Sequence, residues 1–302
     1  MTFTHQGVFA AVCSGLLLSS SFMGSGQAFS PVPQTALRSS ASRNVHSSTS
    51  LSATAFPVAD SVALVTGTNK AKGIGRAIVH ALLDNGASKV YATARDVSAL
   101  DDLVKECNGK VVPVVLDVTD HEAVAKLPDQ CPDVTLLVNN AGLAAGQTVT
   151  ETDMQGMKLE IDVNYFGTVA TVQAFAPIFK SNPKPTAIVN LNSIAGIINM
   201  PFSATYSASK AAAHSLTQAQ RRELQDSTLV VAVYPGPVET DATADVKDMF
   251  PDMASPQTVA QEIVAALENK VEDVFPDDFS KNLYNAYKAD IKATEAQMAA
   301  PQ

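Results

Sequence analysis

The chain has 302 residues, 46% of them hydrophobic, and a formal net charge of −9. The first 59 positions hold no Asp or Glu, and only two of the 21 Lys and Arg residues, Arg38 and Arg43. Residues 60–302 therefore carry 19 cations against 30 acids, a net charge of −11. This acidic balance argues against nucleic acid or an anionic membrane as a partner, and about 240 residues suffice for one sizeable α/β domain.

The N-terminal segment has the composition of a targeting sequence. Residues 8–18 form an apolar run too short to span a bilayer comfortably, and residues 26–28, Gly-Gln-Ala, form an acceptable signal-peptidase site. Residues 29–59 begin with Phe and continue as a Ser-rich stretch without acids, as in a transit peptide. A signal peptide over 1–28 followed by a transit peptide resembles the bipartite presequences of algae with secondary plastids. The resemblance predicts delivery to the plastid stroma; the alternative is a secretory leader followed by a disordered linker. Neither predicts stable membrane insertion of the mature chain.

From residue 61 onward, apolar runs rich in β-branched residues alternate with runs of helical spacing, without an internal repeat or linker. The expected elements, in chain order, are strand 62–66, helix 73–85, strand 90–94, helix 98–107, strand 111–116, strand 134–138, helix 153–180, strand 187–191, helix 204–225, strand 229–233, helix 256–270 and edge strand 271–275. Most of these strands are apolar on both faces, as in a parallel sheet covered by helices on both sides. The pattern predicts a single doubly wound α/β domain of the Rossmann type, with about seven mostly parallel strands, over residues 60–302.

Several single residues bear on this assignment. Ser98 is expected to cap the second helix, and Pro113 is unfavourable inside the third strand. Cys107 and Cys131 have the spacing of neither a disulfide framework nor a zinc site, and no His stands at metal-ligand spacing, so buried thiols and no metal are expected. His214 is expected to serve helix packing or to be exposed.

The first expected strand leads into a Gly-rich loop, Thr-Gly-Thr-Asn-Lys-Ala-Lys-Gly-Ile-Gly, at residues 66–75. Glycines allow a tight turn and a close backbone approach to a pyrophosphate, and the N-terminus of the following helix favours an anion. In a strand–loop–helix unit this sequence indicates dinucleotide binding.

Tyr206 and Lys210 stand four positions apart in an expected helix, so they share a face, and Ser193 precedes the tyrosine by thirteen positions. A nearby cation favours phenolate over phenol, which makes a tyrosine a better proton donor near neutral pH. The serine hydroxyl can hold a carbonyl oxygen while the proton moves. The three residues predict acid catalysis at a carbonyl, with a hydride from another source.

Together with Asn-Asn-Ala-Gly at residues 139–142, these motifs resemble, in this order, the short-chain dehydrogenase/reductase family. The resemblance spans about residues 62–240 and implies an NAD(P)-binding oxidoreductase. One departure is the Gly-rich loop, where five residues, 68–72, stand between the first glycine and Gly-Ile-Gly instead of the usual three. Individual backbone contacts are therefore not carried over across this insertion. Homodimers and homotetramers are common in the family, so the resemblance also implies a homo-oligomer.

The resemblance assigns Ser193, Tyr206 and Lys210 to catalysis, with Asn164 supporting a water that leads protons towards the lysine; the alternative for Asn164 is a polar residue facing a neighbouring loop. The residues that the resemblance places at the cofactor are Gly67, Lys72, Gly73, Ile74, Gly75, Arg95, Asp117, Val118, Asn140, Ala141, Gly142, Tyr206, Lys210, Pro235, Gly236, Val238 and Thr240. The last four match the segment that holds the nicotinamide carboxamide. Asp117 could instead cap the next turn.

The end of the second strand bears on the choice of cofactor. NAD-dependent members generally carry an acid there, which bonds the ribose 2′-hydroxyl and repels a 2′-phosphate. Here Ala94 is followed by Arg95, and Lys72 supplies a second cation. A guanidinium can grip a phosphate, so these residues favour NADP. The alternative is that Arg95 is a solvated charge paired with Asp96.

The sequence thus predicts a plastid NADPH-dependent carbonyl reductase that acts on a small-molecule aldehyde or ketone, with Tyr206 as general acid. Met249, Phe250 and Met253 are expected in an apolar substrate lid. One alternative is a plastid 3-oxoacyl-carrier-protein reductase, which the acidic mature chain disfavours because acyl carrier proteins prefer basic docking patches. Another is an NADP-sensing binding protein without turnover, which the retention of Tyr206 and Lys210 disfavours.

Overall fold

The structure, a computed structural model, describes residues 54–145, 148–151 and 153–299. The expected signal peptide and nearly all of the expected transit peptide lie outside the described residues. Phe56 and Val58 are buried, and the backbone N–H of Phe56 donates to Leu267 O at 2.8 Å. The folded domain therefore includes residues that precede position 60. Within the described ranges, no helix combines the length and apolarity that crossing a membrane requires.

Seven strands form one sheet in the order β3-β2-β1-β4-β5-β6-β7, and every neighbouring pair is parallel. The strands are β1 Val62–Val65, β2 Lys89–Ala94, β3 Val111–Val115, β4 Leu136–Asn139, β5 Thr186–Leu191, β6 Thr228–Val233 and β7 Asp273–Val274. The order reverses between β1 and β4, which pair with Val65 opposite Val138. In sheets of this kind a ligand crevice opens outside the carboxyl ends of the strands at that reversal.

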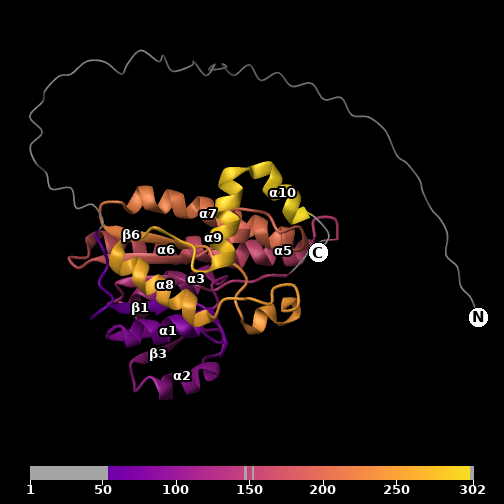
Figure 1. The fold of residues 1–302 in the computed structure, drawn as a ribbon. Coiled ribbons are helices and arrows are strands. Elements are labelled where there is room, and N and C mark those ends of the chain that lie inside the picture. The colour runs from indigo at the N-terminus through magenta and orange to yellow at the C-terminus, as the bar shows by residue number, and fades with distance from the viewer. Residues whose placement is uncertain (1–53, 146–147, 152, 300–302) are drawn as a thin grey trace, which may run out of the picture. The chain divides into compact units, whose positions relative to one another are not determined.

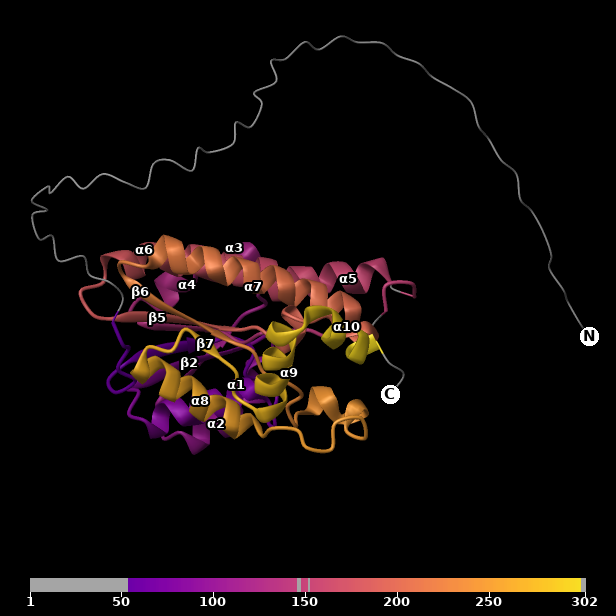
Figure 2. The same ribbon diagram turned by 45° about the horizontal axis from the view of Figure 1, so that its top comes forward.

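Helices cover both faces of the sheet (Figures 1 and 2). On one face lie α1 Ile74–Asp84, α2 Asp101–Glu106 and α8 Pro256–Asn269; on the other lie α3 His121–Ala125, α4 Leu127–Gln130, α6 Gly167–Ser181 and α7 Ala204–Leu224. Successive residues of a strand point to opposite faces of the sheet. In β1, Ala63 and Val65 pack in the apolar core under α1, α2 and α8, whereas Leu64 packs in the core under α3, α4 and α6. The expected doubly wound single domain is thus confirmed.

Pro113 is tolerated because β3 lies at the edge of the sheet, where the outer side of a strand needs no hydrogen-bond donor. The expected cap of the second helix was wrong. The N-cap position of α2 is Leu100, which offers no side-chain cap, and Asp96 instead caps the preceding 3-10 turn, η1 Val97–Leu100: its carboxylate accepts from the backbone N–H of Ser98 at 2.9 Å. An aspartate two residues earlier offers a stronger acceptor than a serine hydroxyl. Cys107 and Cys131 are buried free thiols, as expected.

The expected helix 153–180 is interrupted by a π-helical turn. It consists of α5 Met154–Ile161, η2 Asp162–Phe166 and α6, with the backbone N–H of Gly167 donating to Asp162 O across the turn. Period alone cannot place such a turn, because the apolar pattern continues through it. π-helical turns are frequent at functional sites, and this one contains Asn164.

The chain beyond β5 adds shorter elements and a C-terminal pair of helices. They are η3 Ile194–Gly196, η4 Pro201–Ser203, η5 Asp241–Val246, α9 Asp278–Ala289 and α10 Ile291–Ala299. A third apolar cluster joins η3 and the following loop to Leu283 of α9, with Tyr206 and Met298 packed against it. The C-terminal helices therefore lie beside the tyrosine that the sequence singled out.

Candidate active site

The turns after β1 and β4 are fastened to each other. Thr66 Oγ1 accepts from the backbone N–H groups of Asn140 and Ala141, each at 2.9 Å. The side-chain amide of Asn140 donates to the carbonyl oxygens of Thr66 at 2.7 Å and Gly67 at 2.9 Å. Asn140 thus positions the Gly-rich loop with its side chain.

Two glycines are required where the loop approaches the β4 turn. Gly67 has φ +71, and a Cβ there would lie 2.8 Å from Ala141 Cα. A Cβ on Gly75 would lie 2.5 Å from the Asn140 amide nitrogen. The enlarged loop is accommodated by a turn that closes with a hydrogen bond from Gly73 N to Lys70 O at 3.0 Å. Ile74 then begins α1, whose N-terminus has no side-chain cap, so its backbone donors are available to an anion.

At the end of β2, Arg95 is exposed and lies near Asp117. Burial raises the pKa of Asp117, but hydrogen bonds from Thr119 and the charge of Arg95 outweigh it and lower the pKa overall. Asp117 Oδ1 accepts from Thr119 N at 2.9 Å and Thr119 Oγ1 at 2.7 Å, so it caps this turn. Over the described ranges, Arg95 forms no ion pair with Asp96. Val118 is buried against Gly167 of α6.

Lys72 lies near a different carboxylate. Glu239 is exposed, and its pKa is lowered by the hydrogen bond and charge of Lys247, at 2.9 Å, with a further contribution from the charge of Lys72. Lys72 therefore extends towards the segment that follows β6, and Arg95 towards the turn after β3. The argument for a phosphate-binding cation consequently rests on Arg95.

Ser193, Tyr206 and Lys210 come together at the carboxyl end of β5. Ser193 follows that strand; its hydroxyl accepts from Ala195 N at 3.1 Å and donates to Pro235 O at 3.4 Å, and it lies near enough to the Tyr206 side chain to act on the pKa of the phenol. Lys210 Nζ donates to Leu191 O at 2.7 Å and lies 5.8 Å from the centre of the Tyr206 ring. The structure thus assembles the three residues that the sequence predicted to act together.

Burial dominates the protonation of this pair. Lys210 is 5% exposed, and burial lowers its pKa to about 8. Burial also raises the pKa of Tyr206, against the effect of the Ser193 hydrogen bond, and the charge of Glu160 raises it further. The net direction is therefore upward, and not downward as the lysine alone would suggest, because desolvation outweighs the effect of Ser193. Tyr206 is held as a phenol at neutral pH, the form that can donate a proton.

Asn164 is buried in the π-helical turn, and its side chain is fully used. Its amide donates to Leu143 O and to Ser209 Oγ, each at 2.8 Å, and its oxygen accepts from Leu143 N at 2.9 Å. It holds the chain that follows Gly142, where a Cβ would lie 3.6 Å from Lys210 Nζ. Gly142 therefore lies directly beside Asn164 and the lysine.

The segment after β6 is held from both sides. Pro235 O accepts from Ile194 N at 3.0 Å, and Gly236 N donates to Asp277 Oδ2 at 2.8 Å. The segment continues through Val238, which is buried, to Thr240, which forms a capping box with Thr243. Asp277 was not identified from the sequence; the available signal was an acid three residues before Ser280, whose N–H it caps at 2.7 Å.

An aromatic group lies near the expected lid. Phe250 packs 6.3 Å from Phe202 and 5.6 Å from Phe279, measured between ring centroids. These rings come from η4, from the segment after η5 and from α9, so the lid segment packs with the C-terminal helices. The sequence indicated the contribution of Phe250 but not that of α9.

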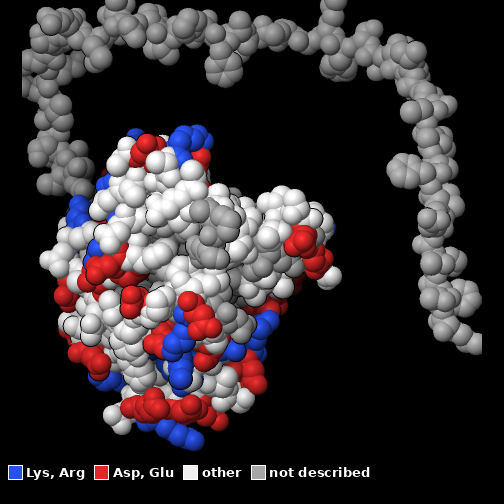
Figure 3. All heavy atoms as spheres, turned by 45° about the vertical axis from the view of Figure 1, so that its right-hand side comes forward, with Lys and Arg blue, Asp and Glu red and all other residues white. Residues whose placement is uncertain are grey.

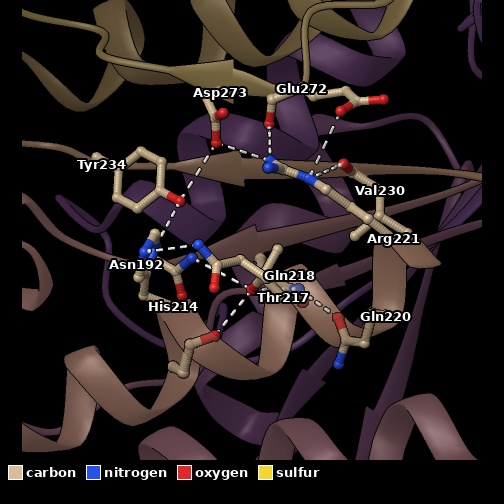
Figure 4. Close-up of polar contacts among 12 residues, drawn as sticks. Asn192, His214, Thr217, Gln218, Gln220, Arg221, Val230, Tyr234, Glu272 and Asp273 are labelled. Carbon is tan, nitrogen blue, oxygen red and sulfur yellow. Dashed lines mark hydrogen bonds and ion pairs between the residues drawn. The ribbon is translucent and has the colours of Figure 1, made fainter. Parts of the chain in front are cut away.

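His214 lies outside the site. Its Nδ1 is 2.8 Å from the Tyr234 hydroxyl, which is 3.3 Å from Asp273 Oδ1 (Figure 4). The group belongs to the attachment of β7 to α7, in accord with the packing role expected for this histidine.

Residues 61–250 match the short chain dehydrogenase family. The chain belongs to this family. An uncharacterized oxidoreductase of Staphylococcus saprophyticus is 35% identical over 218 residues, which cover 69% of this chain and 92% of the relative. An NADP-dependent 3-hydroxy acid dehydrogenase of Schizosaccharomyces pombe is 30% identical over 234 residues, 71% of this chain and 89% of the relative.

Among solved structures, a short chain dehydrogenase from Burkholderia cenocepacia, in complex with NADP, superposes with a TM-score of 0.75 at 35% identity and covers 82% of this chain and 100% of that one. The protein is thus an oxidoreductase of the short-chain dehydrogenase family, with the family's Rossmann-type α/β domain.

Proposed function

We propose that this protein uses NADPH to reduce an aldehyde or ketone to an alcohol, with Tyr206 as general acid. The observation that carries the proposal is the convergence of Ser193, Tyr206 and Lys210 beside Gly142, at the carboxyl ends of parallel strands. Two independent segments, the end of β5 and α7, build this arrangement.

The carboxyl ends of β1 and β4 suit a dinucleotide. The uncapped N-terminus of α1 suits a pyrophosphate, and the absence of a side chain at Gly67 lets the loop lie against the turn after β4. An ammonium has three donors, and the contact with Leu191 O engages one of those of Lys210, which leaves donors for ribose hydroxyls. NADPH, when bound, supplies the hydride.

The residues of the chain supply the proton and the orientation. The Ser193 hydroxyl lies near enough to the Tyr206 side chain to act on the pKa of the phenol, so both hydroxyls can approach one carbonyl oxygen. Because burial keeps the proton on Tyr206, the phenol can release it only when negative charge develops on that oxygen. Lys210, behind the ring, stabilises the resulting phenolate.

The preference for NADP rests on Arg95, and the NADP named for the Burkholderia and Schizosaccharomyces proteins supports it. Arg95→Ala is expected to weaken NADPH binding about tenfold, the loss of a charge-assisted contact, and to leave NADH binding unchanged. Lys72→Ala is the matched control, with a smaller expected loss. Equal binding of NADPH and NADH by the wild type would refute the preference.

NADPH oxidation across aldehydes, ketones, quinones and β-ketoacyl thioesters tests the reaction itself. Turnover of carrier-bound thioesters alone would favour the 3-oxoacyl-carrier-protein reductase. On the face shown in Figure 3, basic residues are interspersed with acidic ones, which lends that alternative no basic docking patch there. Clear NADPH binding without turnover of any substrate would favour the sensor.

We also propose that residues 1–59 direct the protein to a complex plastid, on the strength of their composition. A fluorescent protein fused to residues 1–59 should collect in the plastid stroma, and one fused to residues 29–59 alone should not. Secretion of the first fusion would favour the ordinary secretory leader.

A further inference from the structure

Glu160 is a carboxylate sealed inside the domain. It stands on α5 and is 0% exposed. Its Oε1 accepts from the backbone N–H of Ala145 at 2.6 Å, whereas its Oε2 is buried without a hydrogen-bond partner among the described residues. Burying an acid with one oxygen unpaired is costly, and such a group calls for an explanation beyond packing.

Glu160 lies one helical turn before Asn164 on the same helical segment. The two residues are four positions apart, so they point along one face of the helix. Both hold the chain that follows β4: Asn164 bonds the N–H and C=O of Leu143, and Glu160 bonds the N–H of Ala145. Segment 143–145 therefore depends on two side chains, one helical turn apart, for its place beside the crevice.

A matching pair lies on α7. Ser209 accepts from the Asn164 amide, and Thr205 precedes it by one turn on the same face. Helices α5 and α7 pack against each other, and because each connects neighbouring parallel strands, they run in the same direction. One helical turn before the Asn164–Ser209 hydrogen bond, Glu160 on α5 therefore comes towards Thr205 on α7. The Thr205 Oγ1 atom is also buried without a hydrogen-bond partner in the described part of the chain.

Thr205 stands next to Tyr206 on α7, and the charge of Glu160 acts on the Tyr206 phenol. Among the described residues, Lys210 on α7 lies 5.8 Å from the centre of the Tyr206 ring, and the charge of Glu160 on α5 also acts on the phenol. The titratable side chains of Tyr284 and Tyr287 on α9 pack in the same apolar cluster as Tyr206. The negative charge of Glu160 adds to the effect of burial in raising the pKa of Tyr206.

We propose that Glu160 is a positioning residue of this active site, which anchors segment 143–145 through one carboxylate oxygen and holds its second, unpaired oxygen and its negative charge on the side of α5 that packs against α7. The role rests on the proposed function, since it acts through Tyr206. A purely structural carboxylate would account for the first contact but not for a second oxygen buried without a hydrogen-bond partner among the described residues.

Glu160→Gln is the decisive variant, because a glutamine can still accept from Ala145 N while it carries no charge. We expect the variant to fold with at least wild-type stability. The alkaline limb of the profile of kcat/KM against pH should move to lower pH, because loss of the negative charge makes Tyr206 a stronger acid. Glu160→Ala should show the same displacement and in addition raise KM about fivefold, the loss of one hydrogen bond to segment 143–145.

Two controls isolate the charge. Asp162→Asn removes an exposed acid two positions along the same helix, and Thr205→Val removes the neighbouring hydroxyl without changing charge. Both should leave the alkaline limb in place. An alkaline limb of Glu160→Gln that coincides with that of the wild type would overturn the proposal.

A measurement without turnover separates this proposal from the proposed function. The Tyr206 phenol can be titrated in the full chain by NMR with ¹³Cζ-labelled tyrosine, with Tyr206→Phe to assign its signal. Glu160→Gln should move this titration to lower pH even if no substrate of the enzyme is known. An unmoved titration refutes the role of Glu160, whereas a moved titration in an enzyme that reduces no carbonyl refutes only the proposed reaction.

Discussion

Helix α7 carries two polar groups within three turns of each other, and they differ in how fully their hydrogen bonds are made. In the first, Tyr206 and Lys210 face the crevice, and Thr205 beside them has a buried hydroxyl without a hydrogen-bond partner among the described residues. In the second, His214 and Arg221 face the edge strand β7 with their partners in place (Figure 4).

The second group is a closed network. Arg221 donates to Val230 O at 3.2 Å, to Asp273 Oδ1 at 2.8 Å and to Glu272 O, and His214 is joined to Tyr234. These contacts attach a two-residue strand to the helix. The group around Arg221 thus stabilises the attachment of β7, whereas the group around Tyr206 includes a buried hydroxyl, that of Thr205, with unmet hydrogen-bond capacity.

The comparison is tested most strongly by Tyr206→Phe. Loss of the proton donor should lower kcat for carbonyl reduction by at least about 100-fold, while the ring keeps its apolar contacts and the melting temperature changes little. Tyr234→Phe, in the closed network, is the matched control and should retain kcat. Intact reduction by Tyr206→Phe would refute the mechanism.

Lys210→Met should show a dependence of stability on pH. The pKa of Lys210 is about 8 in the fold and 10.5 in the unfolded chain, so charging it costs the folded state about 3 kcal/mol below pH 8. That cost fades as pH rises from 8 towards 10.5. The free energy of unfolding of the wild type, relative to Lys210→Met, should therefore increase by about 2–3 kcal/mol between pH 7 and pH 10 in denaturant titrations. A constant difference would contradict the burial of this charge.

Arg221→Met should act on stability alone. It leaves Asp273 and two carbonyl oxygens without their donor, which is expected to cost about 1–3 kcal/mol in the free energy of unfolding. Because the network is remote from Tyr206, kcat should stay within about twofold of the wild type after correction for the folded fraction. A large loss of kcat in fully folded protein would show that the network around Arg221 also contributes to catalysis, contrary to the comparison.

The smallest effect is expected for His214. Burial lowers its pKa, against the charge of Asp273, so the neutral ring is favoured in the fold. Its contribution to stability is present above the unfolded value of 6.5 and is lost as pH falls through the folded pKa. Wild type should therefore lose stability relative to His214→Asn in thermal melts below pH 6.5, with no change above it.

The sequence predicted those features that depend on hydrophobic periodicity and on short motifs. The alternating elements, the order of the layers and the set Ser193, Tyr206 and Lys210 all follow from residues close together in the chain. It could not predict Asp277, since its contact with Gly236 joins residues 41 positions apart. Nor could it predict the direction of the Tyr206 pKa, because a sequence shows the neighbouring cation but not the desolvation.

Both edges of the sheet are poor templates for another chain. At one edge, Pro113 removes a backbone donor from the middle of β3; at the other, β7 offers only two residues, Asp273 and Val274. Short edges and edge prolines oppose strand addition and the aggregation that follows from it. Copies of this chain that associate would therefore have to do so through their helices and loops rather than by extending the sheet.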